Sequence, residues 1–265
     1  MSTTSPASPA VLKIGGSLIE DPAAMEVFWS SVRALRNEMP LVVVHGGGPQ
    51  ATEMARRLGH EPEIVNGRRV TTDLDLQIMQ WTVRGELNSR LAAMAGRAGL
   101  SAVGLCGVDG GTVQVKRRPP WTIDGRQVDF GWVGDIQEVR PALLQTLLAG
   151  GHTPIVAPLG VDDAGQIYNV NADTIAAAIA RALGAALFAL VTDSGGVRRD
   201  ATDAATVISA MSASDFEAGA EAGWISRGML VKLSVAFDAR KAGIPDVWVL
   251  APDDLATRSR GTRIL

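Results

Sequence analysis

Apolar positions along the chain follow two alternating spacings, one typical of strands and the other of helices. Segments of strand length that are rich in apolar residues recur at residues 10–16, 40–48, 100–107, 152–160, 186–197 and 245–250. Between these runs, apolar side chains recur every three or four residues, as Met25, Phe28, Val32 and Leu35 do within 22–37. That spacing places them on one face of a helix. The same spacing predicts further helices at residues 49–59, 73–98, 140–150, 172–184, 211–218 and 229–242.

Two segments depart from this alternation and are predicted to form β-hairpins. Residues 112–135 contain short strands around an "IDGR" turn, and residues 161–170 turn at "DDAG". Elsewhere strands alternate with helices, which is the pattern of βαβ units. The sequence therefore predicts an α/β fold with a mainly parallel sheet and helices on both of its faces.

Composition and charge narrow the classes of partner. The 265 residues are 46% hydrophobic and 20% charged, as in ordinary globular domains, and the net charge of −3 disfavours a nucleic-acid partner. The single cysteine, Cys106, excludes an internal disulfide and fits a cytoplasmic protein. No apolar run is long enough to span a membrane, so we expect no membrane partner. Residues 1–9, rich in Ser, Thr and Pro, lack the features of a signal peptide and are expected to form a disordered leader.

Glycines follow the first two apolar runs. Residues 15–17 read "GGS" after the first run, and residues 46–48 read "GGG" after the second, where a helix is expected to begin. A glycine-rich turn into a helix exposes backbone N–H groups to an anion, although glycines also simply permit tight turns. Two such loops at neighbouring strand ends favour anion binding. The sequence contains neither G-x-x-x-x-G-K-[ST] nor G-x-G-x-x-G, so any phosphate-binding lysine must come from elsewhere.

Two lysines and two aspartates are the candidate charged groups. Lys13 interrupts the first apolar run, and a lysine is rarely buried without a partner. Lys232 lies in the first turn of the helix expected from Met229, where a solvated surface lysine is the alternative. Together the two lysines suit a phosphoryl group, whose charge is spread over several oxygens. Asp173 and Asp193 could contribute to such a site, or could serve only as a helix-start carboxylate and a turn residue.

Amide and guanidinium side chains supply candidate groups for a carboxylate ligand. Asn169 and Asn171 share one face of an extended segment, where two amides could hold a carboxylate or an amide. Arg68 and Arg69 precede "VTTD"; an arginine fork binds a carboxylate through two N–H groups, although most surface arginines are only solvated. The three histidines and the cysteine show no metal-ligand spacing, so we expect no metal site built by the protein.

Short motifs along the chain carry a family resemblance. They are "KIGGS", "VVHGGGP", "NGRRVT", "AVGLCGVDG", "NVNAD", "TDSGGV", "GMLVK" and "GTRIL". In this order they resemble the amino-acid kinase family, and "NGRRVT" with "NVNAD" resembles its acetylglutamate kinase branch in particular. The resemblance covers the chain from about residue 10 onward. It implies a three-layer αβα sandwich in which two lobes share one mainly parallel sheet. Residues 10–168 would bind the amino-acid substrate and form a dimer face, and residues 169–265 would bind ATP.

The resemblance also implies an activity, the transfer of the γ-phosphoryl group of ATP to the side-chain carboxylate of N-acetyl-L-glutamate in arginine biosynthesis. Mg²⁺ would accompany ATP, held mainly by the phosphates. Lys13 and Lys232 would stabilise the transferring phosphoryl group, and Asp173 would hold both lysines in place. The residues implied for the amino-acid substrate are Gly47, Gly48, Arg69 and Asn169. Those implied for the nucleotide are Gly15, Gly16, Asp193, Gly195, Gly196, Val197, Gly228 and Met229.

Several alternatives remain open at this stage. A kinase of another N-acylated or carrier-linked acidic amino acid, such as N-succinylglutamate or an aminoadipate, is the nearest one. A non-catalytic regulatory relative would be expected to lack one of the two lysines or Asp173, and all three are present. Arg227 stands near the expected nucleotide phosphates, where the family usually has a small or acidic residue. Trp81 lies off the apolar stripe of helix 73–98, as expected of a homodimer face or of an ordinary core tryptophan.

Overall fold

The computed structural model describes residues 8–225 and 227–265. Most of the leader predicted at residues 1–9 therefore lies outside the described residues. Pro9, the last residue of that prediction, is buried, and its carbonyl accepts a hydrogen bond of 2.9 Å from the Ala186 N–H. This end of the predicted leader is corrected, because the chain is already packed against the sheet at Pro9.

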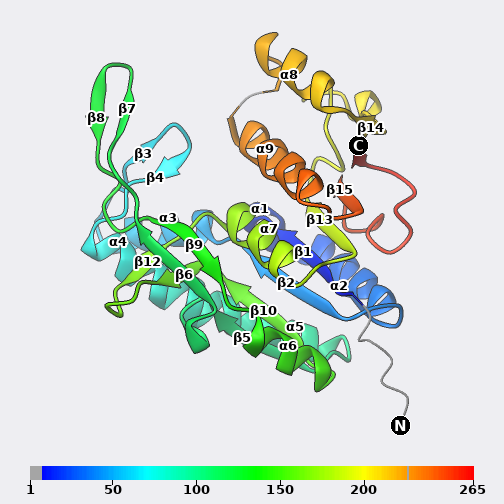
Figure 1. Cartoon of the computed structure of the whole chain (residues 1–265), viewed down its shortest axis with the longest axis horizontal. Helices are drawn as coiled ribbons and strands as arrows, with labels where there is room; N and C mark the ends of the chain where they lie inside the picture. The colour runs from blue at the N-terminus through cyan, green and yellow to red at the C-terminus, as the bar shows by residue number, and fades with distance from the viewer. Residues whose placement is uncertain (1–7, 226) are drawn as a thin grey trace.

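An eight-stranded sheet forms the centre of the fold (Figure 1). Neighbouring strands are parallel except for the last pair along the chain, β15 and β16. The strands predicted from the apolar runs all lie in this sheet, because strands buried on both faces are apolar throughout. In spatial order the strands are β14 (Ala210–Met211), β16 (Thr262–Ile264), β15 (Asp246–Leu250), β13 (Leu187–Val191), β1 (Ala10–Ile14), β2 (Leu41–His45), β10 (Thr153–Ala157) and β5 (Ala102–Cys106).

Helices cover both faces of the sheet, which gives the three layers expected (Figure 1). One face packs against α1 (Gly16–Ile19), α2 (Pro22–Arg36) and α5 (Asn88–Arg97), and we call it the α2 side. The other face packs against α6 (Ala142–Ala149), α7 (Ala172–Ala182), α8 (Ala213–Glu221) and α9 (Arg227–Lys241), and we call it the α7 side. None of the helices in the described part of the chain is long and apolar enough to cross a bilayer.

The helix predicted at residues 73–98 is continuous but changes its winding. It comprises α4 (Asp73–Ile78), a π-helical stretch (Met79–Leu87) and α5, and both junction residues keep α-helical φ and ψ. Thr72 starts it with a capping box to Asp75. The π-helical stretch packs beside α3 (Gly48–Arg57), the helix that follows β2. The spacing of apolar residues cannot reveal this change. The π and α turns differ in the spacing of their backbone hydrogen bonds, and the apolar residues recur on one face in both.

Smaller sheets flank the central one. A four-stranded sheet contains β12 (Ile167–Asn169), β11 (Leu159–Val161), β6 (Val113–Arg117) and β9 (Gly134–Val139), which confirms the hairpins predicted at residues 112–135 and 161–170. Between β6 and β9, β7 (Trp121–Ile123) and β8 (Arg126–Val128) form a projecting hairpin (Figure 1). A further hairpin, β3 (Ile64–Val65) with β4 (Arg68–Arg69), was not predicted. Its turn is Asn66–Gly67 at positive φ, and this Asn-Gly pair was an available hairpin signal. Two short 3₁₀ turns lie at Asp109–Gly111 and Ala204–Thr206.

Candidate functional site

Three charged side chains meet at the carboxyl end of β1. Lys13 Nζ lies 2.8 Å from Asp173 Oδ1, and Lys232 Nζ lies 3.7 Å from Asp173 Oδ2. Lys13 points to the α7 side, because its neighbours Leu12 and Ile14 pack on the α2 side. The structure thus brings together the three residues that the sequence singled out for phosphoryl transfer. One detail is corrected: α9 begins at residue 227, so Lys232 lies in its second turn rather than its first.

Burial and mutual charge set the protonation of this cluster. The side chains of Lys13 and Asp173 are only 6% and 7% exposed, against 24% for Lys232. Burial acts to raise the pKa of Asp173, but the two lysines outweigh it and hold that pKa below its ordinary value. Burial lowers the pKa of Lys13, and the charge of Asp173 opposes this. With one carboxylate between two ammonium groups, the cluster carries a surplus of positive charge where an anion could bind.

Two glycine loops lie beside this cluster and touch each other. Gly15 precedes α1, and a Cβ built on it would lie 4.0 Å from the Nζ of Lys13. A Cβ on Gly16 would lie 2.6 Å from Pro49 Cδ in the second loop. A Cβ on Gly47 would lie 2.7 Å from both methyl groups of Val83, in the π-helical stretch. A side chain at residue 16 would therefore clash with the second loop, and one at residue 47 would clash with the π-helical stretch, whereas residue 15 has ordinary van der Waals space.

The second loop offers free N–H groups. The Gly46 carbonyl lies 2.7 Å from His45 Nδ1, and the Gly48 carbonyl accepts a hydrogen bond of 3.2 Å from Arg69 Nη2. In contrast, the N–H groups of Gly47 and Gly48 make no hydrogen bond to any residue within 8–225 and 227–265. They stand at the N-terminus of α3, where a helix presents unpaired donors. The loop can therefore bind an anion through these two groups.

Arg69 reaches the same loop from the unpredicted hairpin β3–β4. Its side chain is 9% exposed, and Nη2 also donates to Thr52 Oγ1 in α3. Its Nη1 lies 3.5 Å from Asp75 Oδ1. Burial lowers the pKa of Arg69, and Asp75 opposes this shift. The guanidinium is thus held beside Gly48, as a carboxylate-binding role requires.

Asp75 is a residue of the site that the sequence analysis missed. It is 2% exposed, and its Oδ2 accepts hydrogen bonds from Thr72 N and Oγ1 at 3.1 and 2.6 Å. His60 Nε2 lies 3.2 Å from its Oδ1. Burial acts to raise the pKa of Asp75, but the Thr72 and His60 contacts outweigh it and keep that pKa low. The Thr-x-x-Asp spacing at residues 72–75 is a capping-box signal, although it does not reveal the contact with Arg69.

A small cavity joins Arg69 to Asn169, another of the predicted substrate residues. Its volume is about 110 Å³, and both residues line it together with Asn171. Asn171 Oδ1 accepts a hydrogen bond of 3.0 Å from the α7 backbone, so this side chain caps the helix. Arg68 and Arg118 complete the basic lining. An amino acid with a free α-carboxylate and a polar N-substituent matches this set of donors.

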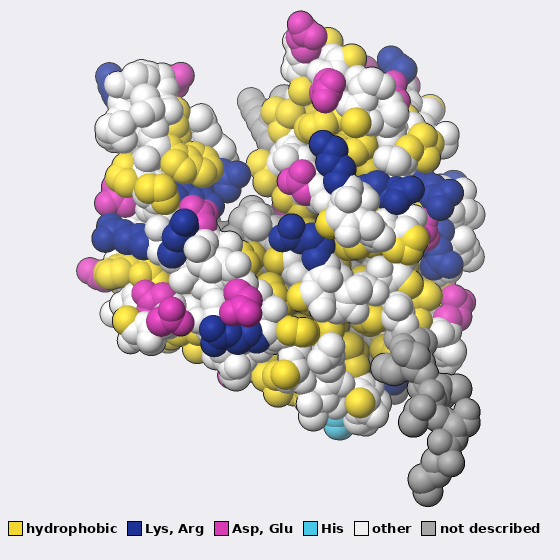
Figure 2. All heavy atoms as spheres, in the orientation of Figure 1, with side chains coloured by type: hydrophobic (Ala, Val, Ile, Leu, Met, Phe, Trp, Pro, Cys, Tyr) yellow, Lys and Arg dark blue, Asp and Glu magenta, His cyan; other side chains and the backbone are white. Residues whose placement is uncertain are grey.

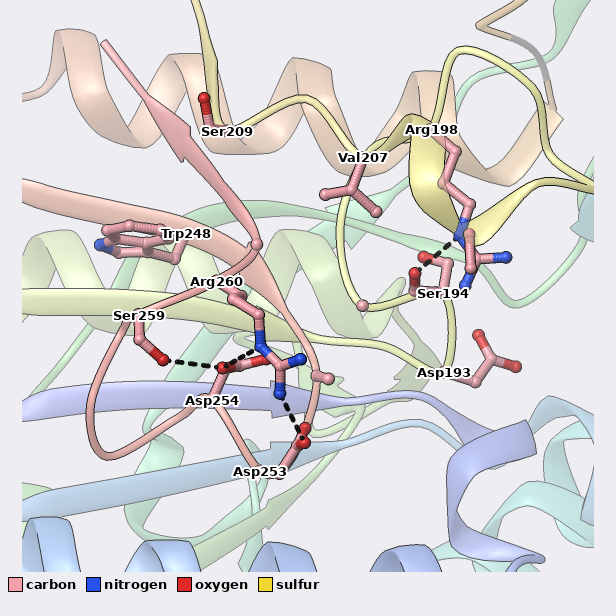
Figure 3. A pocket seen from close by; sticks show the side chains of 14 residues that line it. Asp193, Ser194, Arg198, Val207, Ser209, Trp248, Asp253, Asp254, Ser259 and Arg260 are labelled. Atoms are coloured by element: carbon pink, nitrogen blue, oxygen red, sulfur yellow. Dashed lines mark hydrogen bonds and ion pairs between the residues drawn. The ribbon is translucent and has the colours of Figure 1, made fainter.

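The loop after β13 borders a second, larger cavity, of about 520 Å³ (Figure 3). Asp193 and Gly195 line it, as does the indole of Trp248. Trp248 packs on the α2 side of the sheet, whereas Lys13 faces the α7 side. The cavity and the charged cluster therefore lie on opposite sides of the carboxyl edge of the sheet, and the loop stands between them. The other charged residues lining the cavity are Arg198, Asp253, Asp254 and Arg260.

The predicted nucleotide residues that follow Gly195 in the sequence do not line this cavity. Gly196 has φ +148°, and a Cβ on it would lie 2.8 Å from Val207 Cγ1. Val197 is 1% exposed, and its N–H donates to Thr262 Oγ1, so these groups are occupied within the protein. Gly228 is exposed on α9, and Met229 packs against the core of the α7 side. The side chain of residue 227, which the sequence placed near the nucleotide, lies outside the described residues.

Comparisons with known proteins agree with the motifs and the fold. Residues 8–250 match the profile of the Amino acid kinase family. The acetylglutamate kinase of Anaeromyxobacter dehalogenans is 40% identical over 252 residues, 92% of this chain and 93% of that protein. The acetylglutamate kinase of Methanothrix thermoacetophila is 36% identical over 241 residues, 91% of this chain and 83% of that protein. A crystal structure of smu.665 from Streptococcus mutans UA159 is similar with a TM-score of 0.81 and 25% identity, covering 97% of this chain and 98% of that one. The resemblance and the predicted fold are confirmed, and the chain belongs to the amino acid kinase family.

Proposed function

We propose that the chain transfers the γ-phosphoryl group of ATP to the side-chain carboxylate of N-acetyl-L-glutamate, a step of arginine biosynthesis. The observation that carries this proposal is the pair of lysines on Asp173 beside the free N–H groups of Gly47 and Gly48. The names of the curated relatives support the choice of substrate. The single cysteine is compatible with a cytoplasmic enzyme.

The reaction requires the protein to position the substrates and to stabilise negative charge, and it does not require a general base. A glutamate carboxylate has a pKa of about 4.3, so it is already an ionised nucleophile at neutral pH. One carboxylate oxygen attacks the γ-phosphorus, the bond from that phosphorus to the β,γ-bridging oxygen breaks, and ADP leaves. Lys13 and Lys232 would stabilise the charge spread over the transferring group, and Asp173 would keep both lysines in place.

The substrate would be held on the β3–β4 side of the site. Arg69 would bind the α-carboxylate, and Asn169 would bind the acetamido group, since both line the small cavity. Gly47 and Gly48 would donate to the reacting carboxylate, and the bond from Arg69 to the Gly48 carbonyl connects the two ends of this site. The bound amino acid would then be positioned before phosphoryl transfer begins.

The nucleotide would occupy the other side of the charged cluster. Gly15 and Gly16 would offer N–H groups close to Lys13, and the loop Asp193–Val197 and the start of α9, with Gly228 and Met229, would border the rest. Both oxygens of Asp173 face a lysine, so this carboxylate is not free to bind a cation. Mg²⁺ would therefore be held mainly by the phosphates, where it would neutralise part of their charge.

The lobes and the oligomer are part of the same proposal. Figure 2 shows the surface hollowed between the side that carries β3–β4 and β7–β8 and the side that carries α8 and α9, with basic side chains along its border. This hollow lies between a substrate lobe of residues 10–168 and a nucleotide lobe of residues 169–265.

Trp81 is 56% exposed and Leu74 on the same helix 36%, so we assign this helix face to a homodimer. Light scattering should give a dimer mass, and Trp81→Glu should shift it towards the monomer; an unchanged mass would refute this face.

An ADP-release assay tests the function directly. N-acetylglutamate, N-succinylglutamate, aspartate and carbamate are each supplied with ATP and Mg²⁺, and we expect ADP release to depend on N-acetylglutamate. Lys13→Met should abolish most of this release, whereas Lys241→Met, at the exposed end of α9, is the matched control and should not. A purified, folded protein that releases no ADP with N-acetylglutamate would refute the proposal.

A further inference from the structure

A buried polar chain lies directly behind the second glycine loop. His45, the last residue of β2, is fully buried, and its Nδ1 lies 2.7 Å from the Gly46 carbonyl oxygen. Its Nε2 lies 3.0 Å from Nδ2 of Asn88, which is also fully buried, at the start of α5. Asn88 Nδ2 donates in addition to the Ile155 carbonyl at 2.8 Å. Burying two polar side chains is costly unless they are hydrogen-bonded, as these two are, and the reaction described above does not use them.

The hydrogen bonds fix which nitrogen of His45 carries the proton. A carbonyl oxygen can only accept, so Nδ1 must donate to Gly46. The amide of Asn88 is oriented by its other partners, because Nδ2 donates to a carbonyl while Oδ1 faces Arg84 Nη1 at 3.3 Å. Nε2 of His45 must therefore accept. Burial, with a smaller contribution from Arg84, lowers the pKa of His45 to about 4, so the ring is neutral with its proton on Nδ1 at pH 7.

This bond determines the direction of the Gly47 N–H. Along β2, Val43 packs on the α2 side and Val44 on the α7 side, so His45 points to the α2 side with Val43. The Gly46 carbonyl is turned towards His45. In a trans peptide the carbonyl and the following N–H point in opposite directions, and no described peptide bond is cis. The Gly47 N–H is therefore turned to the α7 side, where Lys13 and Asp173 lie.

We propose that His45 is a positioning residue for phosphoryl transfer, whose Nδ1–H holds the Gly46 carbonyl and so aims the Gly47 N–H at the acceptor carboxylate. This inference rests on the proposed function of the site. The peptide between Gly46 and Gly47 is flanked by residues without a Cβ on either side, so it has more freedom to rotate than any other kind of peptide. A buried hydrogen bond removes that freedom before substrate binds, which is the condition for an effective preorganised donor.

Two substitutions separate the two ring nitrogens of His45. In His45→Asn the amide nitrogen takes approximately the place of Nδ1 and can still donate to the Gly46 carbonyl. In His45→Gln the amide takes approximately the place of Nε2, and the donor to Gly46 is lost. Both variants remove buried volume and should lower the melting temperature. Only the loss of the Nδ1 donor should affect the chemical step.

The expected kinetic result is a split between these variants. Removing a whole preorganised donor costs roughly 10²–10³ in kcat, so losing only its orientation in His45→Gln should cost about 10- to 100-fold. His45→Asn should stay within about five-fold of wild type, and the KM for ATP should change less than about two-fold in both variants, since neither touches the nucleotide side. Equal kcat losses in the two variants, or no loss in either, would overturn the proposal.

The tautomer of the unmodified enzyme gives a second test that does not depend on the variants folding. In ¹⁵N imidazole spectra at pH 7, with the signals of His60 and His152 identified through His60→Gln and His152→Gln, His45 should carry its proton on Nδ1. A proton on Nε2 in an active enzyme would refute the positioning role and leave the proposed function standing. An Nδ1 proton in an enzyme that releases no ADP with N-acetylglutamate would refute the proposed function instead, and with it the role assigned here.

Discussion

Replacing Lys13 by methionine keeps a long, unbranched side chain at this position but removes the positive charge from a buried ion pair. In the native protein Lys13 Nζ lies 2.8 Å from Asp173 Oδ1, and both side chains are more than nine-tenths buried. In Lys13→Met the Asp173 carboxylate would keep only Lys232, at 3.7 Å and on the more exposed side of the cluster. The variant therefore measures the free energy of unfolding that is lost when this buried carboxylate keeps only one of its two lysine partners.

The expected loss of stability in Lys13→Met follows from these contacts. Removing one partner of a buried pair typically costs about 3–5 kcal/mol, and because Lys232 remains we expect about 3 kcal/mol at pH 7. For a chain of this size the melting temperature should then fall by roughly 6–12 °C. The two lysines hold the pKa of Asp173 below its ordinary value, so they contribute stability that is present above about pH 4 and is lost as the pH falls through the lowered pKa. In the variant the carboxylate protonates more readily, so its stability deficit should shrink from pH 7 towards pH 4.

Urea unfolding followed by tryptophan fluorescence at pH 7 and pH 4.5 measures this deficit. The double variant Lys13→Met/Asp173→Asn should recover most of the lost stability, because no buried charge is left unpaired. It should not recover activity, and kcat should remain about 10²-fold or more below wild type. An unchanged urea midpoint in Lys13→Met, or a deficit that is equal at both pH values and unrelieved by the second substitution, would refute the reasoning.

Three further predictions concern the surrounding groups. Arg69→Lys should raise the KM for N-acetylglutamate about ten-fold or more with little change in the KM for ATP, because a point charge cannot replace the guanidinium fork; initial rates at varied concentrations of each substrate measure this. Gly47→Ala should destabilise the protein by about 1–3 kcal/mol, because its Cβ would meet Val83 at 2.7 Å, whereas Gly48→Ala meets nothing within 4 Å and should have a near-native urea midpoint. Because burial lowers the pKa of His45 from 6.5 to about 4, the unfolded chain binds the proton first as the pH falls. This group should therefore cost about 3 kcal/mol of stability between pH 6.5 and pH 4, and urea midpoints that show no such loss relative to His45→Gln would contradict the assignment.

The sequence by itself determined the central architecture and the chemical types at its edge. The inner strands are buried on both faces, so their apolar runs are continuous and leave little ambiguity, and the helices between them must cover both faces of the sheet. Lys13 stood out because a lysine within such a run needs a partner. Glycines at both neighbouring strand ends indicated an anion site, since their spacing relative to the runs is a local property of the chain.

Only the tertiary structure decided which groups meet. Lys13, Asp173 and Lys232 come from a strand and two helices that are far apart in the sequence, and their contact depends on where β1, α7 and α9 lie around the sheet. The contact between Asp75 and Arg69 and the contact between Asn88 and His45 also depend on the tertiary structure, because no local sequence pattern connects the residues of either pair. Hydrophobic periodicity records which face of an element is buried, but not which neighbour buries it. The direction of the Gly47 N–H therefore became visible only when strand order, peptide geometry and the buried ring of His45 were known together.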